Sequence, residues 1–232
     1  MENSSFEKQI KKKLSSGNQD LDIILEGGYS VASNVMISGP TGNEKNTIAY
    51  HFISAMEKDE IGIIICGNSS AKDIIEKAEL SGVNLNNKDI YFIDCYSNTI
   101  GKKVEETANM RVLGGPGALN DLSLTINEIM KANAGKRTRL IYNTLSSFVI
   151  YNPSDSVRKF LSFVGGRTKT AGGTTIFLVD EGVHDKQLSS LLEQGMDMVI
   201  DIVEKEGKMT LQIPGIEIPV PFKVGPGGLT IV

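Results

Sequence analysis

The sequence predicts an α/β fold: a three-layer α/β/α core with a mostly parallel central sheet and short antiparallel strands at the C-terminus. Two observations carry this prediction. Short apolar runs alternate with segments of helical length, which is typical of a parallel sheet covered by helices on both faces. The runs at 61–66 and 175–180 are almost continuously apolar, as strands buried on both faces are.

The elements follow one another at short intervals along the chain. The expected strands lie at 34–38, 61–66, 90–94, 139–143, 175–180 and 198–203. The expected helices lie at 45–57, 71–80, 121–133, 155–171 and 186–194. Prolines punctuate the last part, where 208–213, 216–222 and 229–232 suggest short antiparallel strands. No linker or internal repeat divides the sequence, so residues 1–232 are expected to form one domain.

Charge and composition exclude several classes of protein. Hydrophobic residues make up 40% of the 232 and charged residues 22%, as in soluble globular proteins. The net charge of −4 argues against a dedicated nucleic-acid binder, which usually carries a basic excess. Lysines at 8, 11, 12 and 13 form a local basic stretch, which we interpret as a solvated helix face.

The cysteine pattern and the apolar runs point to the cytoplasm. Cys66 and Cys95 lie in or just after strand-like runs and form no metal-binding spacing, so buried free thiols are expected. No run has the roughly 18 apolar residues of a membrane-spanning helix. The N-terminus lacks the apolar core of a signal peptide. We therefore expect a cytoplasmic protein without a structural metal and without a membrane partner.

The segment GPTGNEKN at 39–46 is an altered phosphate-binding loop between an apolar strand and a helix. The P-loop pattern is G-x-x-x-x-G-K-[ST], in which backbone N–H groups and the lysine hold phosphates and the hydroxyl holds Mg²⁺. Gly39 and Lys45 match, but Glu44 replaces the second glycine and Asn46 the hydroxyl residue. The candidate nucleotide-binding residues of this vestigial loop are Gly39, Pro40, Thr41, Gly42, Asn43, Glu44, Lys45, Asn46 and Thr47.

Stretches along nearly the whole chain resemble the KaiC-like branch of the RecA-superfamily ATPases, especially the single-domain archaeal kind. They include GNQDLDIILEGG before the loop, AKDIIEKAELSGVNLNNKDIYFIDCYS after the second strand, and PGALNDLSLTINEIM. The segment RLIYNTLSSFVIYNPSDSVRKFLSFVGGRTKTAGGTTIFLVDEGVHD is similar to the Walker B strand and the elements after it. The resemblance implies a RecA-like P-loop NTPase core with its nucleotide site at a subunit boundary.

The chain departs from this family at the positions that carry the chemistry. Asn143 stands where the Walker B Asp is expected, and Gly67 and Asn68 stand where the family has its catalytic Glu pair. With Glu44 and Asn46, the metal site, the water-activating site and the loop are all altered. The resemblance therefore implies a pseudo-ATPase with no catalytic residue, no bound metal and no required cofactor, rather than a working enzyme.

Three functions compete on the sequence alone. The first is a regulatory or interaction module whose partner is a copy of itself or a catalytically intact KaiC-like relative. The second is a protein that binds ATP weakly and acts as a slow ATPase or a nucleotide-gated switch. The third is a DNA-associated RecA-type mediator. The acidic balance and the lack of a basic, aromatic-rich loop argue against a nucleic-acid partner.

The remaining polar residues have structural interpretations as well as functional ones. Glu44 can be a helix-start residue whose carboxylate fills the anion site and pairs with Lys45. Asp180 and Glu181 follow a strand, where capping is favoured over lining a ligand crevice.

Two further candidate sites are weak. Ser146, His184 and Asp185 could in principle form a catalytic triad, but adjacent His and Asp residues do not imply one. Gly114, Gly115 and Gly117 form a glycine-rich loop beside Arg111, and a phosphate cradle there is a minor alternative.

Overall fold

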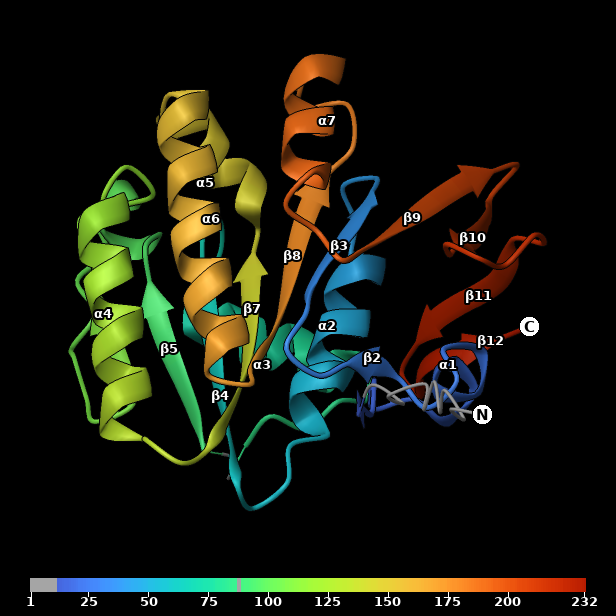
Figure 1. Ribbon diagram of the computed structural model, residues 1–232, viewed down its shortest axis with the longest axis horizontal. Helices are drawn as coiled ribbons and strands as arrows, with labels where there is room; N and C mark the ends of the chain where they lie inside the picture. The colour runs from blue at the N-terminus through green and yellow to red at the C-terminus, as the bar shows by residue number, and fades with distance from the viewer. Residues whose placement is uncertain (1–11, 87–88) are drawn as a thin grey trace, which may run out of the picture.

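The computed structural model describes residues 12–86 and 89–232. Within these residues a ten-stranded sheet has the order β12-β11-β10-β9-β3-β8-β7-β4-β5-β6 (Figure 1). Its centre is parallel and contains all six expected strands: β3 (Asn34–Gly39), β4 (Glu60–Cys66), β5 (Ile90–Asp94), β7 (Arg137–Asn143), β8 (Thr174–Asp180) and β9 (Met198–Lys205). The predicted mostly parallel α/β sheet is confirmed.

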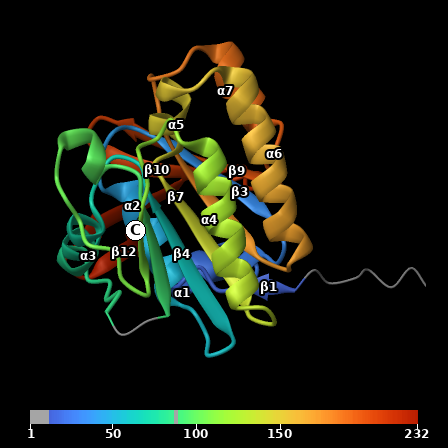
Figure 2. The ribbon, with the colours of Figure 1, turned by 90° about the vertical axis from the view of Figure 1, so that its left-hand side faces the viewer.

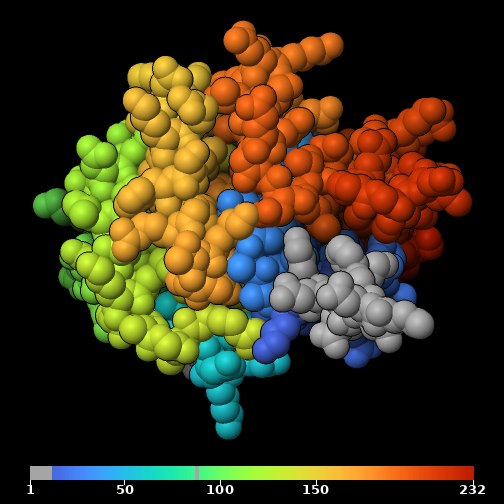
Figure 3. All heavy atoms as spheres, in the orientation of Figure 1, coloured from blue at the N-terminus to red at the C-terminus, as the bar shows by residue number. Residues whose placement is uncertain are grey.

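Helices cover both faces of this sheet (Figures 1 and 2). One apolar core lies under α2 and α3, and a second lies under four helices on the opposite face. Figure 3 shows the outer side of this second layer, with α4 and α6 on the left, the C-terminal strands on the right and α7 between them at the top. The helices are α2 (Glu44–Ser54), α3 (Ala71–Leu80), α4 (Leu119–Ala132), α5 (Leu145–Tyr151), α6 (Ser154–Thr170) and α7 (Lys186–Glu193).

Several short elements were not expected from the sequence. They are β1 (Lys13–Leu14), α1 (Gln19–Ile24), β2 (Tyr29–Ser30), the 3₁₀ turn η1 (Ser97–Ile100), β6 (Met110–Val112) and α5. Strands of two or three residues are too short for a hydrophobic period to be recognised. The helix α1 does carry a start signal, because the Asn18 side chain accepts a hydrogen bond from the Leu21 N–H at 2.9 Å.

The C-terminal strands are antiparallel, as expected, but one of them is displaced. β10 (Lys208–Gln212), β11 (Val220–Gly225) and β12 (Gly228–Ile231) extend the sheet beyond β9. The expected strand at 216–222 begins too early, since β11 and its pairing with β10 start only at Val220. Pro214 and Pro219 flank the preceding turn, and proline cannot donate a ladder hydrogen bond.

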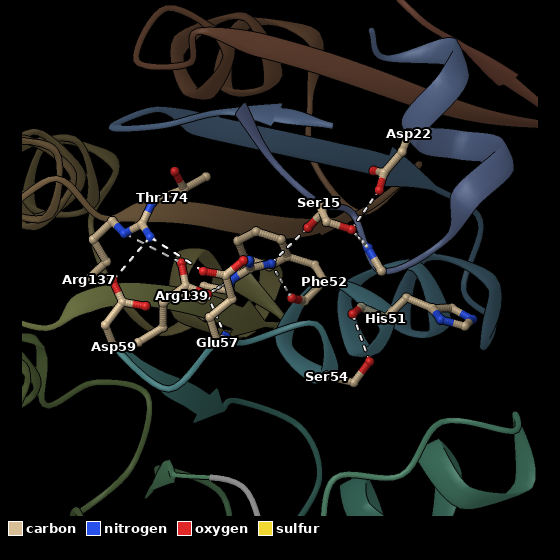
Figure 4. Close-up of polar contacts among 12 residues, drawn as sticks. Ser15, Asp22, His51, Phe52, Ser54, Glu57, Asp59, Arg137, Arg139 and Thr174 are labelled. Atoms are coloured by element: carbon tan, nitrogen blue, oxygen red, sulfur yellow. Dashed lines mark hydrogen bonds and ion pairs between the residues drawn. The ribbon is translucent and has the colours of Figure 1, made fainter. Parts of the chain in front are cut away.

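A buried arginine joins the segment before α1 to the sheet. The Arg139 Nε donates to Glu60 Oε2 at 2.9 Å, and its Nη1 donates to the Ser15 and Phe52 carbonyls, each at 2.8 Å (Figure 4). The guanidinium also lies 4.9 Å from the centre of the Phe52 ring. Because a buried charge is costly unless it is paired and hydrogen-bonded, this cluster fixes β4, β7, α2 and the Ser15 segment together.

The basic stretch near the N-terminus does not form a helix face in the part that the structure describes. Lys8 and Lys11 lie outside the described residues. Lys12 is exposed, whereas the Lys13 Nζ donates to the Leu25 and Gly28 carbonyls at 2.8 and 3.1 Å. The expected solvated helix is therefore wrong at Lys13, which is a structural residue of β1. Separately, the helices of the described ranges are all too short or too polar to cross a lipid bilayer.

Candidate functional site

The altered phosphate-binding loop forms the expected strand–turn–helix. β3 ends at Gly39 and α2 begins at Glu44, at the edge where the parallel strands have their carboxyl ends. Ligands of α/β proteins bind at this edge. Gly39 must be glycine, because an added Cβ would lie 2.7 Å from the Ile202 Cβ on the neighbouring strand.

The lysine of the loop is buried and bound to the protein itself. The Lys45 side chain is 3% exposed, and its Nζ contacts Asp180 Oδ1 at 2.9 Å and donates to the Pro40 carbonyl at 2.6 Å. The expected pairing of Lys45 with Glu44 is therefore wrong. The preference for a capping role of Asp180 is also wrong, because this carboxylate enters the loop from the end of β8.

Glu44 and Asn46 occupy the two positions that differ from the phosphate-loop pattern. Glu44 begins α2, where an acidic residue is favoured, and its carboxylate folds back against Gly42. Within the described residues no loop N–H donates to that carboxylate, so it does not replace a bound phosphate. The Asn46 Nδ2 donates to the Gly42 carbonyl at 3.2 Å, which closes the loop on itself. Thr47 is buried and donates to the Asn43 carbonyl at 2.9 Å.

The three other altered positions lie together beside the loop. In the parallel pair of β4 and β7, Cys66 is opposite Asn143, and the Gly67 N–H donates to the Asn143 carbonyl at 2.5 Å. The Asn143 Nδ2 donates to the Tyr50 hydroxyl at 3.4 Å. Burial raises the pKa of Tyr50, so this hydroxyl stays protonated. Asn68 is exposed, and its Oδ1 accepts a hydrogen bond from the Ser69 hydroxyl at 3.0 Å.

A cavity of about 450 Å³ opens between the loop and α3. Sequence reasoning missed three of its residues: Ser69, Lys77 and Thr144. The signal for Lys77 was present, since it lies on α3, the helix that follows β4 and Gly67. The cavity is lined by Thr41, Gly42, Asn43, Lys45, Asn46, Asn68, Ser69, Lys77, Thr144 and Asp180.

These residues do not fit a magnesium ion. The position of the Mg²⁺-binding hydroxyl carries an amide that donates to the loop, and the Walker B position carries an amide bound to Tyr50. The one carboxylate that lines the cavity, Asp180, is paired with Lys45. Within the described residues no three His, Cys, Asp or Glu side chains are grouped to hold a metal. Mg²⁺ prefers carboxylate and water oxygens in octahedral geometry, which this set does not provide.

The structure brings Ser146 and His184 together but does not form a triad. The Ser146 Oγ lies 2.9 Å from the His184 Nε2 and accepts a hydrogen bond from the Asp180 N–H at 2.9 Å. The contact between Ser146 and His184 was not expected from the sequence, whereas the doubt about Asp185 as the third member was justified. Asp185 instead caps α7 by accepting from the Leu188 N–H at 2.8 Å, and Ser146 is 2% exposed. The pair therefore fixes the loop after β8, and no substrate reaches the serine.

The glycine-rich loop does not form a phosphate cradle. The Arg111 Nη1 donates to the Thr107 carbonyl at 2.6 Å, so this guanidinium is held by its own hairpin. A Cβ at Gly114 or Gly117 would meet nothing within 4 Å. The two cysteines are buried and free, as expected.

Comparison with known proteins identifies a family that agrees with the fold. The sequence profile of the family described as "ATPase: KaiC" matches residues 14–216. The circadian clock oscillator protein KaiC of Synechococcus elongatus is 26% identical over 186 residues, covering 77% of this chain and 34% of the relative. KaiC of Parasynechococcus marenigrum is 26% identical over 175 residues, covering 73% and 32%. This chain thus spans about a third of the length of these curated relatives. Because the profile matches most of its residues, the chain belongs to the KaiC ATPase family.

Proposed function

We propose that this protein is a pseudo-ATPase, a KaiC-type core that does not hydrolyse ATP and works as a regulatory or interaction module. The observation that supports this proposal most is that the residues at the family's phosphate-binding and metal-binding positions contact the protein's own atoms. Lys45 pairs with Asp180 at 2.9 Å, Asn46 donates to Gly42, and Asn143 donates to Tyr50. Phosphoryl transfer needs a metal to neutralise developing charge and a group that orients the nucleophile. The cavity offers neither.

The catalytic carboxylate positions support the same proposal. General-base assistance contributes about 10²–10⁴ in rate, and neither Gly67 nor the Asn68 amide can accept a proton from water. An added Cβ at Gly67 would lie 2.8 Å from the Thr144 carbonyl oxygen. The Thr144 backbone therefore occupies the space that a side chain at position 67 would need. The surrounding packing fits glycine at this position and not the glutamate of the family pattern.

Because the fold is intact but the cavity lacks the groups that hydrolysis needs, we propose that the protein acts by contact with a partner. We take residues 1–232 as one KaiC/RecA-like domain, because β10, β11 and β12 continue the same sheet as the parallel strands. The partner that we propose is a second copy or a catalytically intact KaiC-like relative. A stable interface of this kind would bury about 1,200–2,000 Å² in total. We place the protein in the cytoplasm, where free buried thiols such as Cys66 persist.

The test is an ATPase assay on purified protein together with light scattering. We expect hydrolysis at background, and no change in that background for Lys45→Ala. We also expect a particle larger than one chain, or capture of an intact relative when the two are mixed. Turnover at the rate of an ordinary ATPase that is lost in Lys45→Ala would contradict the pseudo-ATPase proposal. A strict monomer that captures no relative would contradict the interaction role.

One observation favours a second candidate, a nucleotide-gated switch. The cavity of about 450 Å³ beside the loop is large enough for part of a nucleotide, and Lys45 still lines it. A ligand that binds only the native state stabilises it by RT ln(1 + [L]/Kd). A thermal-shift titration with ATP, with and without Mg²⁺, separates the two functions, since the switch requires a shift at physiological ATP.

A further inference from the structure

A groove runs between α4 and α6 on the outer side of the second helix layer (Figures 2 and 3). One hollow of about 540 Å³ lies between the starts of the two helices, and a second of about 860 Å³ lies between their ends. Phe163 lines both hollows, so together they form one groove, which we call the α4–α6 groove. Along α4 it extends from Leu119 to Lys131, which is roughly 18 Å of helix.

The middle of the α4–α6 groove is apolar and open to solvent. Leu124 of α4 is 60% exposed and Phe163 of α6 is 50% exposed. Leu119, Met130 and Phe160 continue the apolar lining on either side of them. Exposed apolar residues that stand singly are normal, but a contiguous group in a groove indicates an interaction site.

The rim of the groove is basic. Its lining contains no Asp or Glu but five cations, which are Lys131, Lys136, Arg137, Lys159 and Arg167. Lys136 contacts Asp89 at 2.6 Å, and Arg137 is likewise neutralised by acidic residues outside the groove. The salt bridges of residues 12–86 and 89–232 do not include Lys131, Lys159 or Arg167. The groove therefore keeps positive charge on a chain whose net charge is −4.

These cations are not explained by the helix ends alone. Lys131 and Arg167 lie in the last turns of α4 and α6, where the helix dipole favours a cation. Lys159 lies near the other end of α6, where the dipole gives no such reason. The Arg167 guanidinium also lies over the apolar lining, 5.4 Å from the centre of the Phe163 ring. The groove thus places a positioned positive charge directly beside an exposed aromatic ring.

The groove suits a helix better than an extended chain. The backbone groups of α4 and α6 are hydrogen-bonded within their own helices, so the groove offers no free edge to a strand. A docked helix satisfies its own backbone and can place an apolar ridge between two helices. Acidic residues beside that ridge would face the cations of the rim, and such charge complementarity favours one class of partner over others.

We propose that the α4–α6 groove binds an amphipathic helix of a partner protein, about 12 residues long, with an apolar ridge and acidic flanks. This inference rests on the proposed interaction role, and it names the surface and the kind of partner. The groove shares no residue with the cavity beside the phosphate-binding loop. It is therefore a site separate from the nucleotide position of the family.

Fluorescence anisotropy tests the inference on the full chain with two labelled synthetic peptides. One is a helix former with a leucine ridge flanked by glutamates, and the other has lysine in place of each glutamate. Arg167→Glu and Phe163→Ser alter the groove. Arg158→Glu is the charge control, because Arg158 is exposed on the side of α6 that faces α7. Leu80→Ser is the apolar control, because Leu80 is 76% exposed on α3 in the other helix layer.

We expect the acidic peptide to bind at least about tenfold more tightly than the basic one. Arg167→Glu should lower its affinity about tenfold or more, because the variant places like charge against the glutamates. Phe163→Ser should lower it by a similar factor, because it removes the aromatic part of the lining. Both control variants should bind as wild type does, and circular dichroism verifies that every variant is folded.

Three results would overturn the inference: no binding of the acidic peptide up to about 1 mM, equal affinity for the two peptides, or unchanged affinity in both folded groove variants. Displacement of the peptide by single-stranded oligothymidylate would also overturn it, because the cations would then serve a nucleic acid. None of these results bears on light scattering or on capture of an intact relative. The interaction role itself is therefore judged separately.

Discussion

Lys45 and Asp180 form an ion pair inside the phosphate-binding loop, with the Lys45 Nζ 2.9 Å from the Asp180 Oδ1. The two residues come from α2 and from the end of β8, which flank the loop because β3 and β8 are neighbours in the sheet. Asp180 thus holds the lysine that a phosphate would need. Any anion that uses Lys45 must first compete with this carboxylate.

Replacing Asp180 by Asn should strengthen anion binding and weaken the fold. The amide keeps the shape but removes the negative charge, so Lys45 becomes available to a phosphate. We expect affinity for pyrophosphate to rise about tenfold, since hydrogen bonds to charged groups contribute about 1.5–3 kcal/mol. The free energy of unfolding should fall by about 1–3 kcal/mol, because a buried ammonium loses its charged partner. Calorimetry and urea denaturation measure the two effects.

Glu181→Gln is the control for this variant, because Glu181 is exposed and follows Asp180 directly. It changes the net charge by the same amount without touching Lys45. Equal gains in affinity in both variants would show that the effect comes from overall charge, and would refute the role assigned to the ion pair.

Glu44→Gly should also tighten anion binding. The Glu44 carboxylate lies against Gly42 and repels a phosphate in the loop, and glycine restores the backbone freedom of the family pattern. We expect a gain of roughly fivefold, and a stability loss below about 1 kcal/mol because an acidic first-turn residue is removed. The measurement is titration with ATP in EDTA. If Glu44→Gly bound ATP no better than wild type, the carboxylate would have no part in excluding phosphate.

Gly67 should not tolerate a side chain, although the related active proteins are expected to carry a glutamate there. A Cβ at this position would lie 2.8 Å from the Thr144 carbonyl oxygen and 3.0 Å from the Phe148 ring. Overpacking of this kind costs about 1–3 kcal/mol. Gly67→Ala should therefore lower the free energy of unfolding, measured by urea denaturation, by that amount. Gly114→Ala should change it little, because its added Cβ meets nothing within 4 Å. Equal stability of the two variants would refute this packing constraint.

The sequence was sufficient to predict the parallel centre of the sheet and the helices on both faces. Buried strands such as β4 and β8 are short, almost continuously apolar runs rich in β-branched residues, as strands buried on both faces are. The sequence was also sufficient to locate the phosphate-binding loop. Gly39 and Lys45 match the P-loop pattern, and an apolar strand before the loop and a helix after it match the order of elements that this loop requires. Short elements such as β6, and the start of β11, depend on tertiary pairing and have no local signal of their own.

The contacts within the site could not be predicted in the same way. The partner of Lys45 is 135 positions away in sequence, from residue 45 to residue 180, and only the order of strands brings the two together. The nearest carboxylate along the chain, Glu44, was the natural choice and was wrong. His184 and Ser146 meet for the same reason, since β7 and β8 are adjacent and each residue follows one of these strands.

The stability of the fold should fall as the pH drops below about 6.5, and His51 should cause part of this loss. The His51 Nε2 accepts a hydrogen bond from the Leu229 N–H at 3.1 Å, which joins α2 to β12. A protonated ring cannot accept this bond. Burial lowers the pKa of His51 below its usual 6.5, and a hydrogen bond with the Gly17 main chain opposes this shift only in part. The unfolded chain therefore binds the proton more tightly than the folded one.

The sign of the effect follows from linkage. A group whose pKa is lower in the folded state stabilises the fold above its unfolded pKa, and that stabilisation is lost as the pH falls towards the folded pKa. The loss from one histidine cannot exceed about 1.4 kcal/mol per pH unit. His184, whose pKa is also lowered by burial, contributes in the same direction, while the charges of Asp180 and Asp185 oppose it.

Urea denaturation at pH 7.5 and pH 5.5 measures the contribution of each histidine. Wild type should lose stability between these two pH values. His51→Gln and His184→Gln should each lose less, because glutamine does not titrate, while the carboxylates that titrate in the same range are common to all three proteins. Glutamine at position 51 can still accept the Leu229 N–H through its amide oxygen, so the variant separates titration from the loss of a hydrogen bond. Parallel losses in wild type and His51→Gln would show that folding does not lower the pKa of His51, and would refute its part in the pH dependence.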